Sequence, residues 1–153
     1  MVQTKKHAKK LISFVLVSLF VFLFSFSCFA QENTRIINTY TEDLGNGITA
    51  VVTISEVDSL IRSTTFHSIS KDYYQSGSFI GTAALSATFS YNGSTAQATG
   101  ASGTGSGANG WNYGGQNTWT SGSSAYLSAS LSKGGASVPV SLSLTCSPSG
   151  SVS

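Results

Sequence analysis

The chain has 153 residues and a formal net charge of +2, and only 9% of its residues are charged. This length is enough for one hydrophobic core and too short for several domains. Four of the eight basic residues lie within the first ten positions, and residues 31–153 have four basic and six acidic residues, a net charge of −2. Because no basic patch remains, the composition excludes nucleic acid as a partner.

The first thirty residues have the three-part pattern of a secretory signal peptide. Four lysines precede residue 11, residues 11–29 are uncharged and almost wholly apolar, and the small residue Ala30 follows. Cys28 and Ala30 are both small, as a cleavage site requires. The pattern predicts a signal helix at residues 1–30, cleavage after Ala30, and a secreted, extracellular protein of residues 31–153.

Two other fates stay open for this segment. Cys28 could be lipid-modified, although Ser25 and Ser27 stand near it where a lipidation signal has aliphatic and small residues. The apolar run is also about as long as the shortest membrane-spanning helices, so an uncleaved anchor is the third possibility.

Alternation of apolar and polar residues predicts strands in the first half of the remaining chain. The clearest are residues 48–55, which follow Asn46-Gly47, and residues 79–91, in which every second residue from Phe79 to Tyr91 faces the core. Asn92-Gly93 favours positive φ at both central positions of a tight turn, so residues 94–101 should return as the hairpin partner. Residues 35–41 and 63–73 are less sharply patterned strands.

The same alternation recurs near the C-terminus, in residues 125–132 and 138–146, with Gly134-Gly135 between them. Pro139 lacks a backbone N–H, which predicts a sheet edge or a bulge for the second of these strands. In all, the sequence predicts seven to nine strands, with turn signals every eight to twelve residues. That spacing favours an all-β fold, an antiparallel, immunoglobulin-like β-sandwich in a single domain of residues 31–153.

No catalytic or metal-binding pattern is found in residues 31–153. Cys146 is the only cysteine there, so no disulfide can form within the domain, and we expect a buried thiol. His67 has no nucleophile or acid at an informative spacing and is expected to be hydrogen-bonded or solvent-facing. The glycine-rich residues 100–110 lack the following helix of a nucleotide site and are expected to form a flexible loop. The sequence therefore predicts no cofactor, no metal and no enzymatic activity.

An aromatic cluster is the only candidate binding site. Trp111, Tyr113 and Trp119 lie close together among glycine and amide residues. Flat aromatic rings stack on the apolar faces of sugars, and amides bind their hydroxyl groups. The alternative, which the shortage of other large residues favours, places Trp111 and Trp119 in the core and Tyr113 in a turn.

Three segments carry a family resemblance: residues 62–65, residues 81–94 ending in Phe-Ser-Tyr-Asn-Gly-Ser, and the tail from Ser141 through Cys146 to Ser153. They resemble small secreted Ser/Thr/Gly-rich β proteins of Gram-positive, clostridia-like bacteria. The resemblance implies secretion and a sandwich, and it implies no activity and no catalytic residue. In some of these proteins a second cysteine stands where this chain has Ala98, which implies that this chain lacks a bridge to Cys146.

These observations predict a secreted, non-enzymatic interaction module of the cell envelope or extracellular space, with a cell-wall glycan or an envelope protein as its partner. The alternative is a secreted toxin or bacteriocin-like protein that acts on membranes through the amphipathic hairpin of residues 79–101. Its first strand has 13 residues, long enough to cross a bilayer. An ordinary two-layer sandwich explains the same alternation, so we expect the mature domain not to be embedded in a membrane.

If the leader is cleaved as predicted, exported protein should begin at Gln31. Sequencing the N-terminus of material recovered from the culture medium tests this. Recovery of the intact leader in a membrane fraction would contradict the prediction and favour the anchor.

Overall fold

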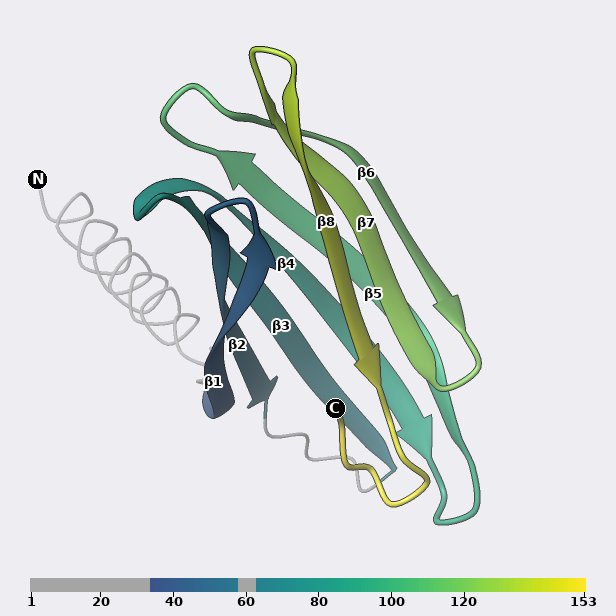
Figure 1. Ribbon diagram of the computed structural model, residues 1–153. Helices are drawn as coiled ribbons and strands as arrows, with labels where there is room; N and C mark the ends of the chain where they lie inside the picture. Colours follow the sequence, from purple (N-terminus) through teal and green to yellow (C-terminus); the bar gives the residue numbers. More distant parts are fainter. Residues whose placement is uncertain (1–33, 58–62) are drawn as a thin grey trace, which may run out of the picture. The chain divides into compact units, whose positions relative to one another are not determined.

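The computed structural model describes residues 34–57 and 63–153, which belong to one compact unit, Glu32–Ser153 (Figure 1). The predicted signal peptide, residues 1–30, lies outside the described residues. Within the described ranges no helix is long and apolar enough to span a membrane.

The described residues form eight strands in two antiparallel sheets, so the predicted all-β class and the number of strands are confirmed. One sheet has five strands in the order β1-β2-β3-β4-β5, and the other has three in the order β6-β7-β8. The strands are β1 (Thr34–Gly45), β2 (Ile48–Val57), β3 (Thr64–Gln75), β4 (Ser78–Tyr91), β5 (Ala96–Gly107), β6 (Asn112–Ser121), β7 (Ser124–Lys133) and β8 (Ala136–Thr145).

Both sheets are meanders, because each strand pairs with the strand before it in the chain. Immunoglobulin domains instead have Greek-key connections between their sheets. The immunoglobulin-like part of the prediction is therefore not confirmed. Alternation locates strands but carries no information on their order.

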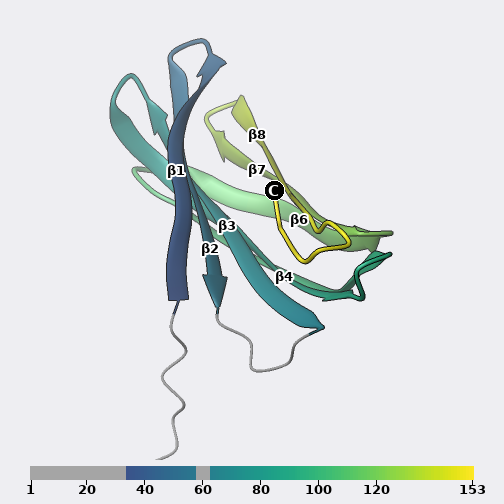
Figure 2. The same cartoon turned by 90° about the horizontal axis from the view of Figure 1, so that it is seen from below.

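The two sheets share one hydrophobic core. Strand β4 contacts β7 and β8, β5 contacts β6 and β7, and β3 contacts β8. Figure 2 shows the two sheets from below. We call the side of each sheet that carries the core residues its inner face. The largest fully buried side chains of the shared core include Tyr73, Phe89, Ile80, Leu85, Leu127, Leu131, Leu142 and Leu144.

A bulge changes the predicted alternation at the start of β4. The pairing of β3 with β4 shifts between Tyr73 and Tyr74, so that Ile80 is the extra residue. Ile80 is therefore buried, and Phe79, predicted to face the core, is only half-buried and packs edge-on against Tyr74 at a ring separation of 5.6 Å. From Gly81 to Phe89 the predicted alternation is confirmed.

The β4–β5 hairpin is confirmed, but its turn differs from the prediction. Tyr91 pairs with Ala96, which leaves a four-residue loop, and within Asn92-Gly93 only Gly93 has positive φ. The Asn92 Oδ1 atom accepts hydrogen bonds from the backbone N–H groups of Ser94 and Thr95 at 3.0 and 2.8 Å. These bonds favour the longer loop. Asn46-Gly47, in contrast, has positive φ at both residues, as a tight turn requires.

The glycine-rich segment is a strand, so the expected flexible loop is wrong. Most of it forms β5, in which Gly103, Gly105 and Gly107 face the second sheet. A β-carbon at Gly103 would overlap Leu127, and one at Gly107 would overlap the carbonyl group of Trp111. The absence of side chains lets the sheets approach closely at these positions.

The C-terminal strands agree with the prediction. Gly134 and Gly135 form the turn with positive φ, and Val138, Val140, Leu142, Leu144 and Cys146 are all buried. Strand β8 is an edge strand of its sheet, as Pro139 predicts.

We expect Gly107→Ala to destabilise the fold by about 1–3 kcal/mol, because the added methyl group must displace backbone at the junction of the sheets. Gly114→Ala is the matched control, since a β-carbon at Gly114 has no neighbour within 4 Å. Denaturant unfolding of both variants measures the difference, and equal midpoints would contradict the close approach.

Candidate functional site

The three aromatic residues of the predicted site differ in their exposure. Trp111 is 6% exposed and belongs to the core, as the favoured alternative predicted. Trp119 is 43% exposed, so its expected place in the core is wrong. Tyr113 lies in β6 and not in a turn; it packs partly buried against the core and its hydroxyl donates to Gln116 Oε1 at 2.9 Å.

A bulge in β6 explains why Tyr113 and Trp119 lie on opposite faces. The pairing of β6 with β7 shifts between Gly114 and Asn117. Tyr113 lies opposite the buried Leu131, whereas Trp119 lies opposite Tyr126 on the outer face. The structure therefore does not bring the three predicted residues together into one ligand face.

The outer face of the three-stranded sheet carries a different aromatic pair. The rings of Trp119 and Tyr126 stack with their centroids 5.2 Å apart and their planes at 14°. The strand register extends this row to Ser143 and places the polar row Asn117, Ser128 and Ser141 next to it. We call these six residues the aromatic–hydroxyl face. None of them is charged.

Sequence reasoning missed Tyr126 as a site residue, although a signal was present. Tyr126 alternates with the apolar residues of β7, so its outward direction could be predicted. Its pairing with Trp119 could not, because it depends on the β6 bulge.

A pocket of about 380 Å³ lies on the inner face of strands β1, β2 and β3, near the edge of the five-stranded sheet. The pocket is lined by Arg35, Ile37, Glu56, His67, Tyr91 and residues 149–152. Arg35 Nη2 donates to Glu56 Oε2 at 2.8 Å. His67 Nε2 shares a hydrogen bond of 2.8 Å with Thr65 Oγ1 and lies 3.8 Å from Glu56 Oε1. These side chains come from three neighbouring strands and meet only through the strand register.

The arrangement around His67 lacks the geometry of a catalytic triad. In a triad the acid orients one ring nitrogen while the other activates the nucleophile. Here Thr65 and Glu56 both approach Nε2, and Nδ1 has no partner among the described residues. His67 is 2% exposed, so it is not solvent-facing, and its burial lowers its pKa against the opposing effect of Glu56.

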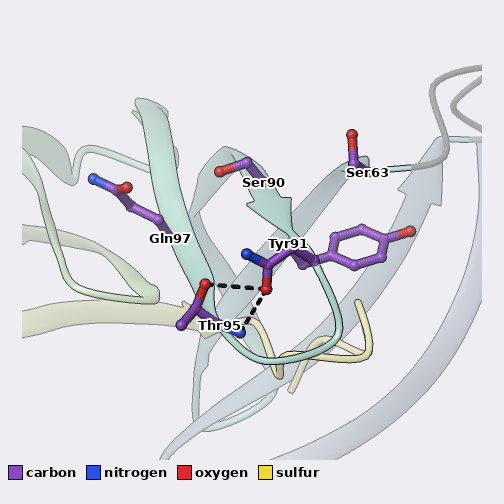
Figure 3. Close-up of a pocket in the computed structure, with 6 residues that line it drawn as sticks. Ser63, Ser90, Tyr91, Thr95 and Gln97 are labelled. Carbon is purple, nitrogen blue, oxygen red and sulfur yellow. Dashed lines mark hydrogen bonds between the residues drawn. The ribbon is translucent and has the colours of Figure 1, made fainter.

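A second pocket, of about 370 Å³, lies at the β4–β5 loop (Figure 3). In Figure 3 the side chains of Tyr91 and Gln97 extend away from each other. Asn92 also lines this pocket, but its side-chain oxygen accepts a hydrogen bond from the backbone N–H of Thr95 within the loop. The polar groups therefore do not converge on one point, as those of a small-molecule site do.

Neither a metal centre nor a reactive thiol is formed by the described residues. They contain no group of three His, Cys, Asp or Glu side chains that could hold an ion. Cys146 is buried and free, and burial raises its pKa, which disfavours the reactive thiolate. Ala98 and Cys146 donate their N–H groups to the neighbouring residues Gly122 and Ser123, so both lie at the same end of the fold.

The environment of His67 predicts a loss of stability in weak acid. The pKa in the folded state is below the ordinary value of 6.5, so the unfolded chain binds the proton first. The free energy of unfolding should therefore fall as the pH decreases below about 6.5. The variant His67→Gln, which keeps a polar group beside Thr65, should flatten this dependence in unfolding measurements between pH 5 and 7.5. An equal pH dependence in both proteins would contradict the prediction.

Comparisons with known proteins identify no family for this chain. No protein-family model, no curated protein and no solved structure matches it. Its function must therefore be inferred from the chemistry of the surfaces described above.

Proposed function

We propose that the protein is a secreted, non-enzymatic interaction module of the cell envelope or extracellular space that binds neutral carbohydrate chains. In this proposal the two sheets form a β-sandwich, and the three-stranded sheet presents the aromatic–hydroxyl face to the ligand. The observation that carries the proposal is the stack of the exposed Trp119 on the half-buried Tyr126, beside the polar row of Asn117, Ser128 and Ser141.

The chemistry of this face suits sugars. The exposed indole of Trp119 offers a flat, electron-rich surface to the C–H groups of a pyranose ring. Asn117 has both donor and acceptor atoms and Ser128 has a hydroxyl group, so both can bond to sugar hydroxyls. The face carries no charge, which favours neutral glycans over polyanionic envelope polymers.

The membrane-hairpin alternative has less support. Leu85 and Phe89 of β4 are fully buried in the shared core, so that hairpin would have to leave the core before it could enter a bilayer. Each such side chain gains roughly 1.5–3 kcal/mol from burial, which opposes the rearrangement.

A pull-down with insoluble cell walls and neutral polysaccharides tests the carbohydrate proposal. Trp119→Ala should lower retention at least about tenfold, a loss of about 1.4 kcal/mol, and Tyr126→Ala should lower it less. Tyr74→Ala is the matched control, because Tyr74 belongs to an aromatic pair on the other sheet. It should bind like the wild type.

Three outcomes would count against the proposal. Equal retention of Trp119→Ala and the wild type would rule out this face, and failure of the wild type to bind any envelope fraction would rule out the glycan. Leakage of dye from liposomes would favour the membrane alternative. Circular dichroism of each variant is the control for folding.

A further inference from the structure

Strand β1 concentrates the exposed apolar surface of the domain. Of the five large apolar side chains exposed among the described residues, four lie on β1: Ile36, Ile37, Tyr40 and Leu44, at 66, 45, 40 and 44%. All but one of the residues of this strand are exposed. An exposed, apolar edge strand is a template for pairing with another strand.

The other sheet edges are less available than β1. Strands β5 and β6 each end a sheet but contact each other, and Pro139 removes one backbone N–H donor from the third edge, β8. Strand β1 ends the five-stranded sheet at the side opposite β5, as Figure 1 shows. Its outward N–H and C=O groups have no neighbouring strand among the described ones.

We propose that β1 pairs antiparallel with β1 of a second copy of this chain, around a two-fold axis at Thr39. Charge complementarity supports this occupant, since β1 carries the basic residue Arg35 near its start and the acidic residues Glu42 and Asp43 near its end. Antiparallel pairing brings the basic start of each strand to the acidic end of the other. The arrangement is isologous, the usual form of a homodimer contact.

The faces of β1 agree with this register. Ile37 is already an extra residue opposite β2, because the pairing shifts between Ile36 and Asn38. In the proposed register, Thr39 lies opposite Thr39 of the second copy, and Ile37 is again the extra residue. The remaining pairs between the two copies are then Tyr40 with Asn38, Thr41 with Ile36, and Glu42 with Arg35. Arg35 and Glu42 share the inner face, since they pair with Glu56 and Ala50, two inner-face positions of β2.

The existing ion pairs can be kept in the dimer. Arg35 contacts Glu56 at 2.8 Å, and Lys71 contacts Glu42 at 2.6 Å. A guanidinium has five N–H donors and a carboxylate has about four lone-pair sites, so each group can serve a further partner. Registers that place acidic ends together are opposed by like-charge repulsion.

The dimer would join the two five-stranded sheets into one continuous sheet. It would also hold two copies of the aromatic–hydroxyl face on one particle, which raises the avidity for a polymer without any new contact. The dimer itself does not depend on the proposed carbohydrate binding.

Disulfide trapping tests the register. Residues directly opposite in an antiparallel pair have Cα atoms about 4.5–5.5 Å apart, within the range of a disulfide. Exported product of the full chain carrying Thr39→Cys should form a covalent dimer on mild oxidation. Thr41→Cys is the matched control: its two copies would be offset by about 13 Å along the strands, so it should stay uncrosslinked, as should the wild type with its buried Cys146.

Sedimentation equilibrium provides a second measurement. The wild type should be a reversible dimer, and Thr39→Lys, which places two ammonium groups at the axis, should raise the dissociation constant at least about tenfold. Equal crosslinking of the two cysteine variants would overturn the register. A monomeric wild type at about 100 µM, or a dimer that Thr39→Lys leaves unchanged, would overturn the proposal.

Discussion

The close approach of β5 to the three-stranded sheet is the constraint on which the rest of the fold depends. At Gly103, Gly105 and Gly107 the space of a side chain is taken by Leu127, Tyr113 and the Trp111 backbone. Because the two sheets lie this close together, residues as small as Ala83 and Ala125 can be fully buried. Few aromatic side chains are then needed to fill the core. The core is thin but can still be close-packed, which is what stability requires in a domain without an internal disulfide.

Local periodicity predicted much of this fold, and the failures have a common cause. Strands β2, β4, β7 and β8 and the edge position of Pro139 follow from alternation and proline chemistry. The bulge at Ile80 shifts the alternation of β4 by one residue, so the side chains before it lie on the face opposite to the predicted one. No local sequence pattern predicts this bulge. Whether a glycine run is a loop or a strand depends on distant partners such as Leu127, which a single segment does not reveal.

The candidate surfaces were harder to predict for the same reason. Trp119 was one of three candidate residues, but the structure does not group it with Trp111 and Tyr113, since Trp111 is buried and Tyr113 faces inward. The contact between Glu56 and His67 joins two strands, and only their register brings the side chains together. Sequence supplies the chemistry of such residues, and the pairing of strands supplies their neighbours.

The meander order has a consequence for how the protein folds. Every strand pair is a hairpin between consecutive segments, so both sheets can form through short loop closures in the order in which the chain emerges. Contacts between distant segments arise only when β6–β8 dock onto β3–β5. We therefore expect docking to be the slow step, and until it occurs the inner face of the five-stranded sheet is exposed. The low charge of the chain gives an undocked sheet little electrostatic protection from self-association, so we expect the yield of folded protein to depend on rapid completion of the C-terminal hairpins.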